Sequence, residues 1–280
     1  MVVAVGAAVI AAVIVCVGVY VWRAEQPAAP SASVGDSGPV RVLVAGDSMP
    51  FTLAAAVAAT GSDRVTGMHV AAATKMGCGV GRADSIIGGE HVPQHPGCRT
   101  WPQEWPARVQ TVDPEATVLL AWAWELYDRR VMHADGSFED LYVGTPEWFE
   151  WFEGEVQAVV DIFTATGAPL VVLTLPCVDL EADTARHPPA ETAEPHRVAS
   201  VNEALERVVD RNADRGVHLL DTNAYLCPDG RYRAVIDDVR LTDDGQHLST
   251  EGGSKLWNDW LSVELRVLLG LEAPSTVERP

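Results

Sequence analysis

Positive charge is scarce in this sequence. Its 280 residues carry 20 Lys and Arg against 39 Asp and Glu, which gives a formal net charge of −19. Almost none of that charge lies before Arg23, so the acidity belongs to the rest of the chain. A surface of this sign repels nucleic acid and anionic lipid headgroups, and we expect no nucleic-acid partner. The length suits one sizeable α/β domain with its own core.

The first 22 residues contain no charge at all. Residues 2–22 form a continuous apolar run that would span about 30 Å as a helix, the thickness of a bilayer core. No Lys or Arg precedes the run, and it is long for a signal peptide, which favours an uncleaved single-pass anchor over residues 1–23. A cleaved signal is the alternative, and the small residues that would permit cleavage are Ala28, Ala29, Ser31 and Ala32.

Composition divides the remainder of the chain. Glu25 to Gly38 (EQPAAPSASVGDSG) is rich in Pro, Ala, Ser and Gly without periodicity, so we expect a flexible linker over residues 24–39. A single domain should follow over residues 40–270, and residues 271–280 should form a disordered tail. No internal repeats are visible.

Cysteine is sparse, with five in the chain. Cys16 lies in the apolar run, and the other four lie beyond it. An even number behind a membrane segment suggests two disulfides in a domain outside the cytoplasm, although Arg23 after the span favours the opposite orientation. Three pairings are possible. We expect Cys78–Cys98, which closes a Gly- and Pro-rich loop, and Cys177–Cys227, whose members each follow a predicted strand.

Apolar strand segments alternate with helical ones along the domain. Strands are predicted at Val40–Ala45, Val65–Ala73, Thr117–Trp122, Pro169–Leu175 and Val217–Asp221. Helices are predicted from the first strand to about Ala59, from Thr145 or Pro146 to Thr166, from His196 to Arg215 and from Thr250 to Leu269. Gly77 to Pro106 has no clear period. This alternation predicts a five-stranded parallel sheet covered on both faces, a three-layer α/β/α sandwich.

Polar residues and glycines follow the predicted strand ends. Ser48, Gly77 and Trp124 each lie just past a strand, and Asp244 and His247 lie in a loop after the fifth strand. Because ligands of such sheets bind at the carboxyl ends of the strands, we expect these segments to converge on one edge.

The stretch LTDDGQHLSTEGG (residues 241–253) places Asp244 three residues before His247. In a tight loop this spacing lets the carboxylate hold the imidazole Nδ1–H, so that Nε2 can act as a general base. Ser48 needs such a base, because a hydroxyl is a poor nucleophile. Its place at a helix N-terminus favours an oxyanion, for which the backbone N–H groups of Ser48 and of Gly77 or Gly79 are candidate donors.

The G-x-S-x-G elbow of α/β-hydrolases is absent. Instead, Gly46-Asp47-Ser48, the block MGCGVG and the block DDGQH resemble the SGNH hydrolase family, also called GDSL esterases, in residue type and order over most of Val40 to Leu269. The resemblance implies a flavodoxin-like fold, a serine esterase with Ser48, Asp244 and His247 as catalytic residues, and no metal or organic cofactor.

One block departs from the family pattern. Trp124-Glu125 stands where the family has Asn-Asp, so the usual amide donor is missing, and Trp124 offers an indole N–H that can donate but is placed differently. This sequence is similar here to SGNH domains fused to, or partnered with, membrane O-acyltransferases that acetylate bacterial polysaccharides, in which Asp-Arg often follows, as Asp128-Arg129 does here. That similarity implies acetylated cell-envelope glycan as substrate and a membrane acyltransferase as a possible partner.

Each candidate residue also has a structural interpretation. Ser48 could be only a helix cap, Asp244 a turn residue and His247 a surface histidine, and Asp243 could orient the histidine instead. Glu125, Asp128 and Arg129 could form a structural ion pair or hold substrate.

Other patterns are ambiguous. Cys78, His91, His95 and Cys98 could bind zinc, although disulfides are favoured, and the Gly-rich loop at residues 77–81 is a weak match to a phosphate loop. Tryptophans near the expected site edge could stack on sugar or pack in the core, and core packing is favoured for each: Trp101, Trp105, Trp122, Trp124, Trp148 and Trp151.

The sequence therefore predicts a membrane-anchored, extracytoplasmic serine esterase that removes acyl groups, acetyl by resemblance, from cell-envelope carbohydrate. Two alternatives stay open. One is an acyl-transfer relay that works with a membrane O-acyltransferase, and the other is a non-catalytic glycan-binding domain on the same fold.

Overall fold

The computed structural model describes residues 38–177 and 194–271. The predicted anchor of residues 1–23, all but the end of the predicted linker and all but the start of the predicted tail lie outside the described residues. Nowhere in the described ranges does a helix combine the length and apolar character needed to cross a membrane. The domain boundaries at residues 40 and 270 therefore stay predictions.

A five-stranded parallel sheet forms the centre of the domain. Its strands, in spatial order, are β2 (Met68–Thr74), β1 (Val40–Gly46), β5 (Ala116–Leu120), β8 (Leu170–Leu173) and β9 (Val217–Leu220). Every residue of β5 and β8 is buried, as expected of strands covered on both faces. The sequence prediction of five parallel strands is confirmed, with small differences at the strand ends.

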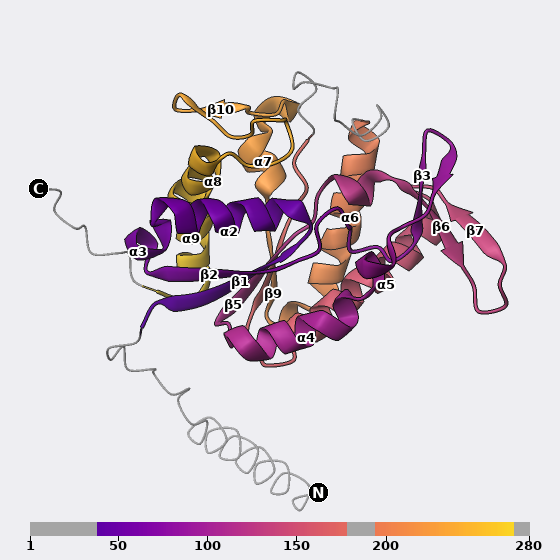
Figure 1. Ribbon diagram of the computed structural model, residues 1–280, viewed down its shortest axis with the longest axis horizontal. Coiled ribbons are helices and arrows are strands. Elements are labelled where there is room, and N and C mark those ends of the chain that lie inside the picture. The colour runs from indigo at the N-terminus through magenta and orange to yellow at the C-terminus, as the bar shows by residue number, and fades with distance from the viewer. Residues whose placement is uncertain (1–37, 178–193, 272–280) are drawn as a thin grey trace, which may run out of the picture. The chain divides into compact units, whose positions relative to one another are not determined.

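Helices cover both faces of this sheet. Figure 1 shows α4 (Trp101–Val112), α5 (Pro146–Phe163) and α6 (Pro195–Arg211) on one face, and α2 (Ser48–Thr60), α8 (Thr250–Leu256) and α9 (Ser262–Leu268) on the other. Side chains alternate along β1, so that Leu43 and Ala45 pack on the first group and Val42 and Val44 on the second. The domain is thus an α/β/α sandwich with one hydrophobic core on each side of the sheet.

Short elements connect these layers. The π-helical turn η7 (Trp257–Leu261) interrupts the last predicted helix between α8 and α9. Helix α3 (Ser62–Thr66) occupies residues expected to begin the second strand, which starts only at Met68. The remaining elements are α7 (Thr222–Leu226), the hairpin β10 (Val235–Ile236) and β11 (Val239–Arg240), and the 3₁₀ turns η1 (Pro96–Arg99), η2 (Ala123–Leu126), η5 (Ala213–Arg215) and η6 (Pro228–Gly230).

A second, four-stranded antiparallel sheet was not predicted. It consists of β4 (Glu90–Val92), β3 (Asp84–Ile87), β6 (Asp128–Met132) and β7 (Phe138–Leu141), in that order. These strands are short and carry charged residues, so they lack the alternation by which a strand is recognised. The expectation that Gly77 to Pro106 is irregular was wrong, because the stretch contains β3, β4, η1 and the start of α4. Two prolines, Pro102 and Pro106, obscure the start of that helix.

Candidate active site

The first strand passes into the first helix through Gly46, Asp47 and Ser48. Gly46 has a φ of +136°, and a Cβ added there would lie 2.1 Å from the carbonyl oxygen of Leu120 on β5. Glycine at this position therefore lets β1 and β5 stay paired to the last residue of β1. Asp47 is the N-cap of α2, because its carboxylate accepts the backbone N–H of Met49 at 2.9 Å. The interpretation of Ser48 as a cap is therefore wrong, and Ser48 is the first residue of the helix.

Two hydrogen bonds join Ser48 to the loop before the last helices. Ser48 Oγ lies 2.8 Å from His247 Nε2, and His247 Nδ1 lies 2.7 Å from Asp244 Oδ2. When Nδ1–H is donated to the carboxylate, Nε2 is an acceptor for the hydroxyl proton of Ser48. Such an arrangement can withdraw that proton as the oxygen attacks an electrophile. The structure thus brings together the three side chains that the sequence singled out, and their catalytic roles stay predictions.

The loop that carries His247 is stabilised by hydrogen bonds within it and between its two ends. Asp244 Oδ1 accepts the backbone N–H groups of Gln246 and His247 at 2.9 and 2.7 Å. The backbone N–H of Ser249 donates to the carbonyl oxygen of Leu241 at 2.9 Å, and the Ser249 side chain caps α8. One carboxylate therefore fixes both the loop and the imidazole ring that the loop presents.

The two carboxylates near the nucleophile candidate have pKa values shifted in opposite directions. Burial alone would raise the pKa of Asp244, but hydrogen bonds from His247 and from backbone N–H groups hold this pKa below its ordinary value. Burial raises the pKa of Asp47 from 3.8 to about 7. Asp244 is therefore charged at neutral pH and can stabilise an imidazolium. Its neighbour Asp243 is exposed, and it is Asp244 that bonds to His247.

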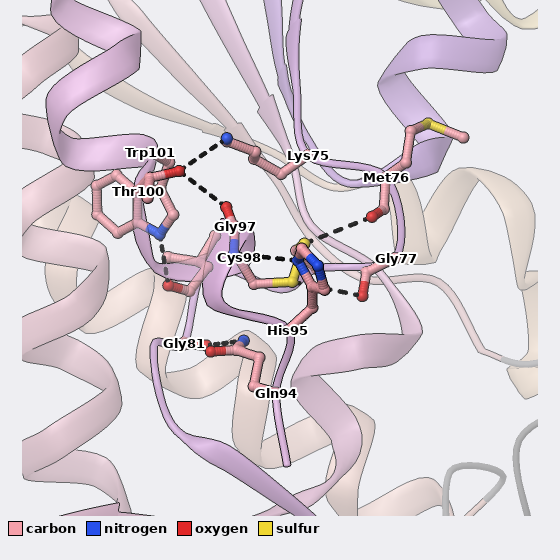
Figure 2. Close-up of a disulfide and its surroundings, with 12 residues drawn as sticks. Lys75, Met76, Gly77, Gly81, Gln94, His95, Gly97, Cys98, Thr100 and Trp101 are labelled. Atoms are coloured by element: carbon pink, nitrogen blue, oxygen red, sulfur yellow. Dashed lines mark hydrogen bonds between the residues drawn. A yellow bond between two sulfur atoms is a disulfide. The ribbon is translucent and has the colours of Figure 1, made fainter. Parts of the chain in front are cut away.

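The loop after β2 begins beside Gly46. The backbone N–H of Lys75 donates to the carbonyl oxygen of Gly46 at 2.9 Å. Gly77 is exposed, has a φ of +70°, and its backbone N–H has no hydrogen-bond partner in the described part of the chain. The Cys78–Cys98 disulfide attaches this loop to η1, as Figure 2 shows. The loop therefore presents an available N–H group on a covalently restrained backbone.

Trp124 lies in η2, just after β5 and next to Gly77. A Cβ on Gly77 would lie 3.9 Å from Cζ2 of Trp124, whose side chain is partly exposed. Gly79, in contrast, is buried, and a Cβ there would lie 2.7 Å from Oε1 of Glu125. The structure thus brings Gly77 and Trp124 together and places Gly79 against Glu125. That Gly77, Gly79 and Trp124 hold an oxyanion or substrate stays a prediction.

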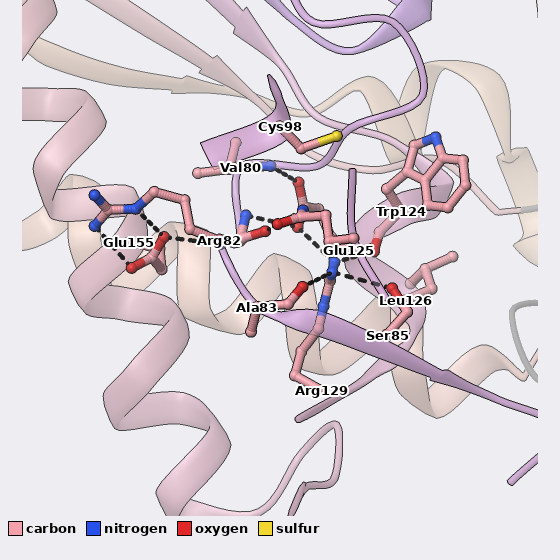
Figure 3. Close-up of polar contacts among 12 residues, drawn as sticks. Val80, Arg82, Ala83, Ser85, Cys98, Trp124, Glu125, Leu126, Arg129 and Glu155 are labelled. Carbon is pink, nitrogen blue, oxygen red and sulfur yellow. Dashed lines mark hydrogen bonds and ion pairs between the residues drawn. The ribbon is translucent and has the colours of Figure 1, made fainter. Parts of the chain in front are cut away.

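The charged residues after β5 form two ion pairs. The side chains of Glu125 and Arg129 are each 1% exposed and lie 3.4 Å apart. Asp128 pairs instead with Arg197 of α6 at 2.7 Å. Sequence reasoning missed that the Glu125 carboxylate accepts backbone N–H groups from the loop after β2 (Figure 3). The available signal was a charged run directly after a buried strand.

Most tryptophans near this edge belong to the core. Buried side chains are those of Trp101, Trp105, Trp122 and Trp148. Trp151 is partly exposed and packs on Gly81, where an added Cβ would lie 2.5 Å from the indole ring. Trp124 and Trp151 are thus both partly exposed beside this loop, and of the two it is Trp124 that lies next to Gly77.

Both predicted disulfides are present. Cys78 and Cys98 are joined with Cα atoms 5.2 Å apart, and Cys177 and Cys227 with Cα atoms 6.1 Å apart. The zinc alternative at Cys78, His91, His95 and Cys98 is therefore wrong, because two of the proposed ligands are in a disulfide. Across residues 38–177 and 194–271, no group of three or more His, Cys, Asp or Glu side chains is placed to hold a metal ion.

Comparison with protein families gives one match, which covers most of the chain. The family is described as the SGNH domain fused to AT3 domains, and it matches residues 19–260. The chain belongs to this SGNH family. No curated protein sequence matches the chain.

Solved structures show the same architecture at low sequence identity. A proposed acylhydrolase from Bacteroides fragilis is 14% identical, with a TM-score of 0.52 over 88% of this chain and 93% of that one. An active-site mutant of a family two carbohydrate esterase from Clostridium thermocellum, in complex with cellohexaose, is 13% identical, with a TM-score of 0.53 over 85% of this chain and 66% of that one. These two similarities show that the SGNH domain described here has a fold that these enzymes share.

A further match is the periplasmic domain of a lipopolysaccharide acetyltransferase from Salmonella ser. Paratyphi A. It is 12% identical, with a TM-score of 0.45 over 84% of this SGNH domain chain and 85% of that one.

Proposed function

We propose that this SGNH domain is a serine esterase that removes acyl groups, acetyl in particular, from carbohydrate outside the cytoplasm. The observation that carries the proposal is the chain of hydrogen bonds from Asp244 through His247 to Ser48 at the start of α2. A hydroxyl, an imidazole and a carboxylate in this order are the groups that acyl transfer to serine requires.

In the first half of the reaction, Ser48 Oγ attacks the ester carbonyl carbon and its proton passes to His247 Nε2. Asp244 stabilises the imidazolium through the 2.7 Å hydrogen bond at Nδ1. The tetrahedral intermediate then expels the sugar oxygen, which takes the proton from Nε2 and leaves as an alcohol. The acyl group remains on Ser48 as an ester.

In the second half, water replaces the sugar. His247 Nε2 accepts a proton from the water as its oxygen attacks the acyl carbon, and then returns that proton to Ser48 Oγ. The carboxylic acid leaves, and the enzyme returns to its starting state with the proton on Ser48 Oγ and His247 Nε2 unprotonated.

The oxyanion of each intermediate needs hydrogen-bond donors. The proposed donors are the backbone N–H groups of Ser48 and Gly77, because Ser48 opens a helix and the Gly77 N–H is unused in the described part of the chain. Gly79 is the weaker candidate, since it is buried against Glu125. The partly exposed Trp124 beside Gly77 is proposed to contact the substrate with its ring or its indole N–H.

Substrate and compartment are proposed on separate grounds. The carbohydrate esterase that shares the fold was solved with an oligosaccharide, which supports carbohydrate as the bearer of the ester. Two disulfides support a domain outside the cytoplasm, where such bonds persist. Anchoring by residues 2–22 is part of the proposal and rests on their apolar sequence.

The test is acetate release from an acetylated oligosaccharide by the purified full-length chain. We expect turnover by the wild type and a loss of at least about 10³-fold in kcat for Ser48→Ala. Ser62→Ala is the matched control, because Ser62 also begins a helix and is buried, and its variant should turn over like the wild type. Equal acetate release by the wild type and Ser48→Ala would contradict the proposal and favour the non-catalytic glycan-binding alternative.

A second candidate function is acyl transfer, in which a sugar hydroxyl replaces water in the second half of the reaction. The observation that favours it is the family description, which links these SGNH domains to AT3 domains. Supplying an acceptor sugar together with the acyl donor distinguishes the two. More acetylated acceptor than free acetate would favour the relay, and free acetate alone would favour the esterase.

A further inference from the structure

The Glu125–Arg129 pair has no part in the reaction as proposed above, yet it is buried beside the site. Each side chain is 1% exposed. Burying two charged groups costs desolvation free energy, which is offset only when their hydrogen bonds are well formed. We therefore ask which parts of the chain the two side chains contact. Glu125 contacts the loop after β2, and Arg129 contacts the turn after β5.

Glu125 holds the loop that carries Gly77. Its carboxylate accepts the backbone N–H of Val80 through a short hydrogen bond and that of Gly81 at 3.4 Å. A Cβ on Gly79 would lie 2.7 to 2.8 Å from the two carboxylate oxygens, so the loop lies directly against this side chain. The Cys78 N–H donates to the carbonyl oxygen of Lys75 at 3.1 Å, so the N–H groups of Cys78, Val80 and Gly81 all have partners. Those of Gly77 and Gly79 have none in the described part of the chain, and of these two residues Gly77 is the exposed one.

Arg129 holds the turn that carries Trp124. Its guanidinium donates to the carbonyl oxygen of Trp124 and lies 3.4 Å from the Glu125 carboxylate. It also donates to the carbonyl oxygen of Ala83, just before the neighbouring strand β3, at 3.4 Å and to Ser85 Oγ, within β3, at 3.3 Å. Figure 3 shows the Glu125 carboxylate directed toward Val80 and the Trp124 ring directed away from it. One ion pair therefore connects the turn after β5 to the loop after β2.

We propose that Glu125 and Arg129 are positioning residues that set the distance between the Gly77 N–H and the oxyanion formed at Ser48. This inference rests on the proposed esterase function. The pair acts through the backbone of the loop and the turn, and it does not itself touch the reacting atoms. The second sheet, which contributes Arg129 through β6 and Ser85 through β3, then serves the site by holding this pair.

The charge of Arg129 has a second role in this arrangement. A lone carboxylate beneath the loop would repel the negative oxygen of the tetrahedral intermediate, and the guanidinium offsets that repulsion. The charge on Glu125 is felt at the junction before Ser48, where it adds to the larger effect of burial in raising the pKa of Asp47.

The test compares Glu125→Gln with Glu155→Gln in the full-length chain. Glu155 is the matched control, because it is a largely buried carboxylate on α5 that accepts the backbone N–H of Arg82, the next residue of the same segment. One measurement is hydrogen exchange of the amides at residues 77–81. The others are kcat, KM and the pH dependence of kcat/KM on an acetyl ester.

For Glu125→Gln we expect faster exchange at residues 77–81 and a kcat about 10- to 100-fold lower, with KM and the pH profile unchanged, because donors are misplaced while the Ser48–His247 geometry is kept. Glu155→Gln should lower the thermal midpoint but keep kcat near that of the wild type. A role in stability alone would not separate the two variants in kcat.

Glu125→Gln leaves the Arg129 guanidinium without its charged partner and could fail to fold. The double variant Glu125→Gln/Arg129→Gln removes both charges together, and the same loss of kcat and faster exchange are expected from it. Wild-type exchange at residues 77–81, or wild-type kcat, in whichever of the two variants folds would overturn the inference. Failure of the esterase proposal itself is distinct, since the wild type would then release no more acetate than Ser48→Ala.

Discussion

Ser48 and Asp47 divide two tasks that a single residue at a helix start could not perform together. A serine that caps a helix spends its oxygen on a backbone N–H. Here the Asp47 carboxylate accepts the Met49 N–H, and the Ser48 hydroxyl is 2.8 Å from His247. The cap is buried, and the proton that its carboxylate takes up near neutral pH is the consequence.

Replacing Asp244 by Asn is predicted to lower kcat by about 10⁴-fold without unfolding the protein. The amide no longer stabilises an imidazolium and can hold His247 in the wrong tautomer. Steady-state hydrolysis of an aryl acetate measures the effect. The control is Asp243→Asn, a change at the exposed neighbour, which should keep wild-type kcat. A loss below tenfold for Asp244→Asn, or equal losses in both variants, would count against the assigned role.

Asp47 is predicted to make stability depend on pH. Its pKa is raised from 3.8 to about 7, so between these values the folded protein keeps a proton that the unfolded chain releases. The free energy of unfolding should therefore fall as pH rises from about 4 to 7 and level off above, by at most about 4 kcal/mol from this group. Asp47→Asn keeps an acceptor for the cap and cannot titrate.

Urea denaturation of the wild type and Asp47→Asn at several pH values measures this contribution. The difference in unfolding free energy should grow in favour of the variant across that pH window. A difference that stays constant with pH would mean that Asp47 titrates near its ordinary value.

The candidate site lies where the carboxyl ends of three neighbouring strands, β2, β1 and β5, come together. Gly46, the last residue of β1, is level with Thr74 of β2 and with Leu120 of β5. Ser48, Gly77 and Trp124 each follow one of these ends by a few residues. The carboxyl ends of parallel strands share an edge, and for that reason sequence order alone was enough to predict where these residues gather.

Gly46→Ala is predicted to destabilise the protein by roughly 2 to 5 kcal/mol and to lower activity. The new Cβ would lie 2.1 Å from the Leu120 carbonyl oxygen, at a φ of +136° that disfavours alanine. Thermal unfolding and aryl acetate turnover measure the two effects. Gly154→Ala is the control, because no atom lies within 4 Å of its added Cβ on α5, and it should stabilise by about 0.5 to 1 kcal/mol. Similar unfolding midpoints for the two variants would contradict the steric argument.

The sequence predicted the elements whose residues are apolar and periodic. The five strands of the main sheet and helices α2, α5 and α6 were found because burial on both faces or on one face leaves a pattern. The second sheet was missed, because Arg129 and Arg130 in β6 and Glu139 and Asp140 in β7 are stabilised by ion pairs rather than by burial in a core. Long-range partners of this kind leave no local period.

Within the candidate site, too, residues with a local sequence pattern were predicted and residues that depend on long-range contacts were not. Ser48, Asp244 and His247 could be named from the sequence, since the residue types and the Asp-x-x-His spacing carry their chemistry. The contacts of Glu125 could not, because they are made with backbone N–H groups of a loop 44 to 45 residues earlier. That Asp47 caps α2 is shown only by the hydrogen bond from the Met49 backbone N–H.

At the scale of the whole molecule, the strand order β2-β1-β5-β8-β9 places the site where the order reverses. The chain goes from β1 outward to β2 and then returns to β5 on the other side of β1. Ser48 follows β1, and Trp124 follows β5, so the candidate nucleophile and the candidate substrate contact flank this switch point. Open α/β sheets bind ligands at such positions because the diverging connections leave room there.

The number of free cysteine thiols is predicted to be that of a domain folded in an oxidising compartment. The chain has five cysteines, and four of them are paired in the structure as Cys78–Cys98 and Cys177–Cys227. Alkylation of the denatured, unreduced full-length chain should therefore modify Cys16 alone, and alkylation after reduction should modify all five. Mass spectrometry of the peptides measures this. Quantitative alkylation of the four paired cysteines before reduction would contradict the extracytoplasmic placement.

We propose above that Ser48 is a nucleophile activated by His247, and this activation can be measured on the residue itself. The most direct measurement is covalent labelling of the full-length chain by a fluorophosphonate, with the labelled residue identified by peptide mass spectrometry. We expect a label on Ser48 in the wild type, much slower labelling in His247→Ala, and no label at this position in Ser48→Ala. Absence of label on Ser48 in the folded wild type, or equal labelling rates in the wild type and His247→Ala, would contradict it.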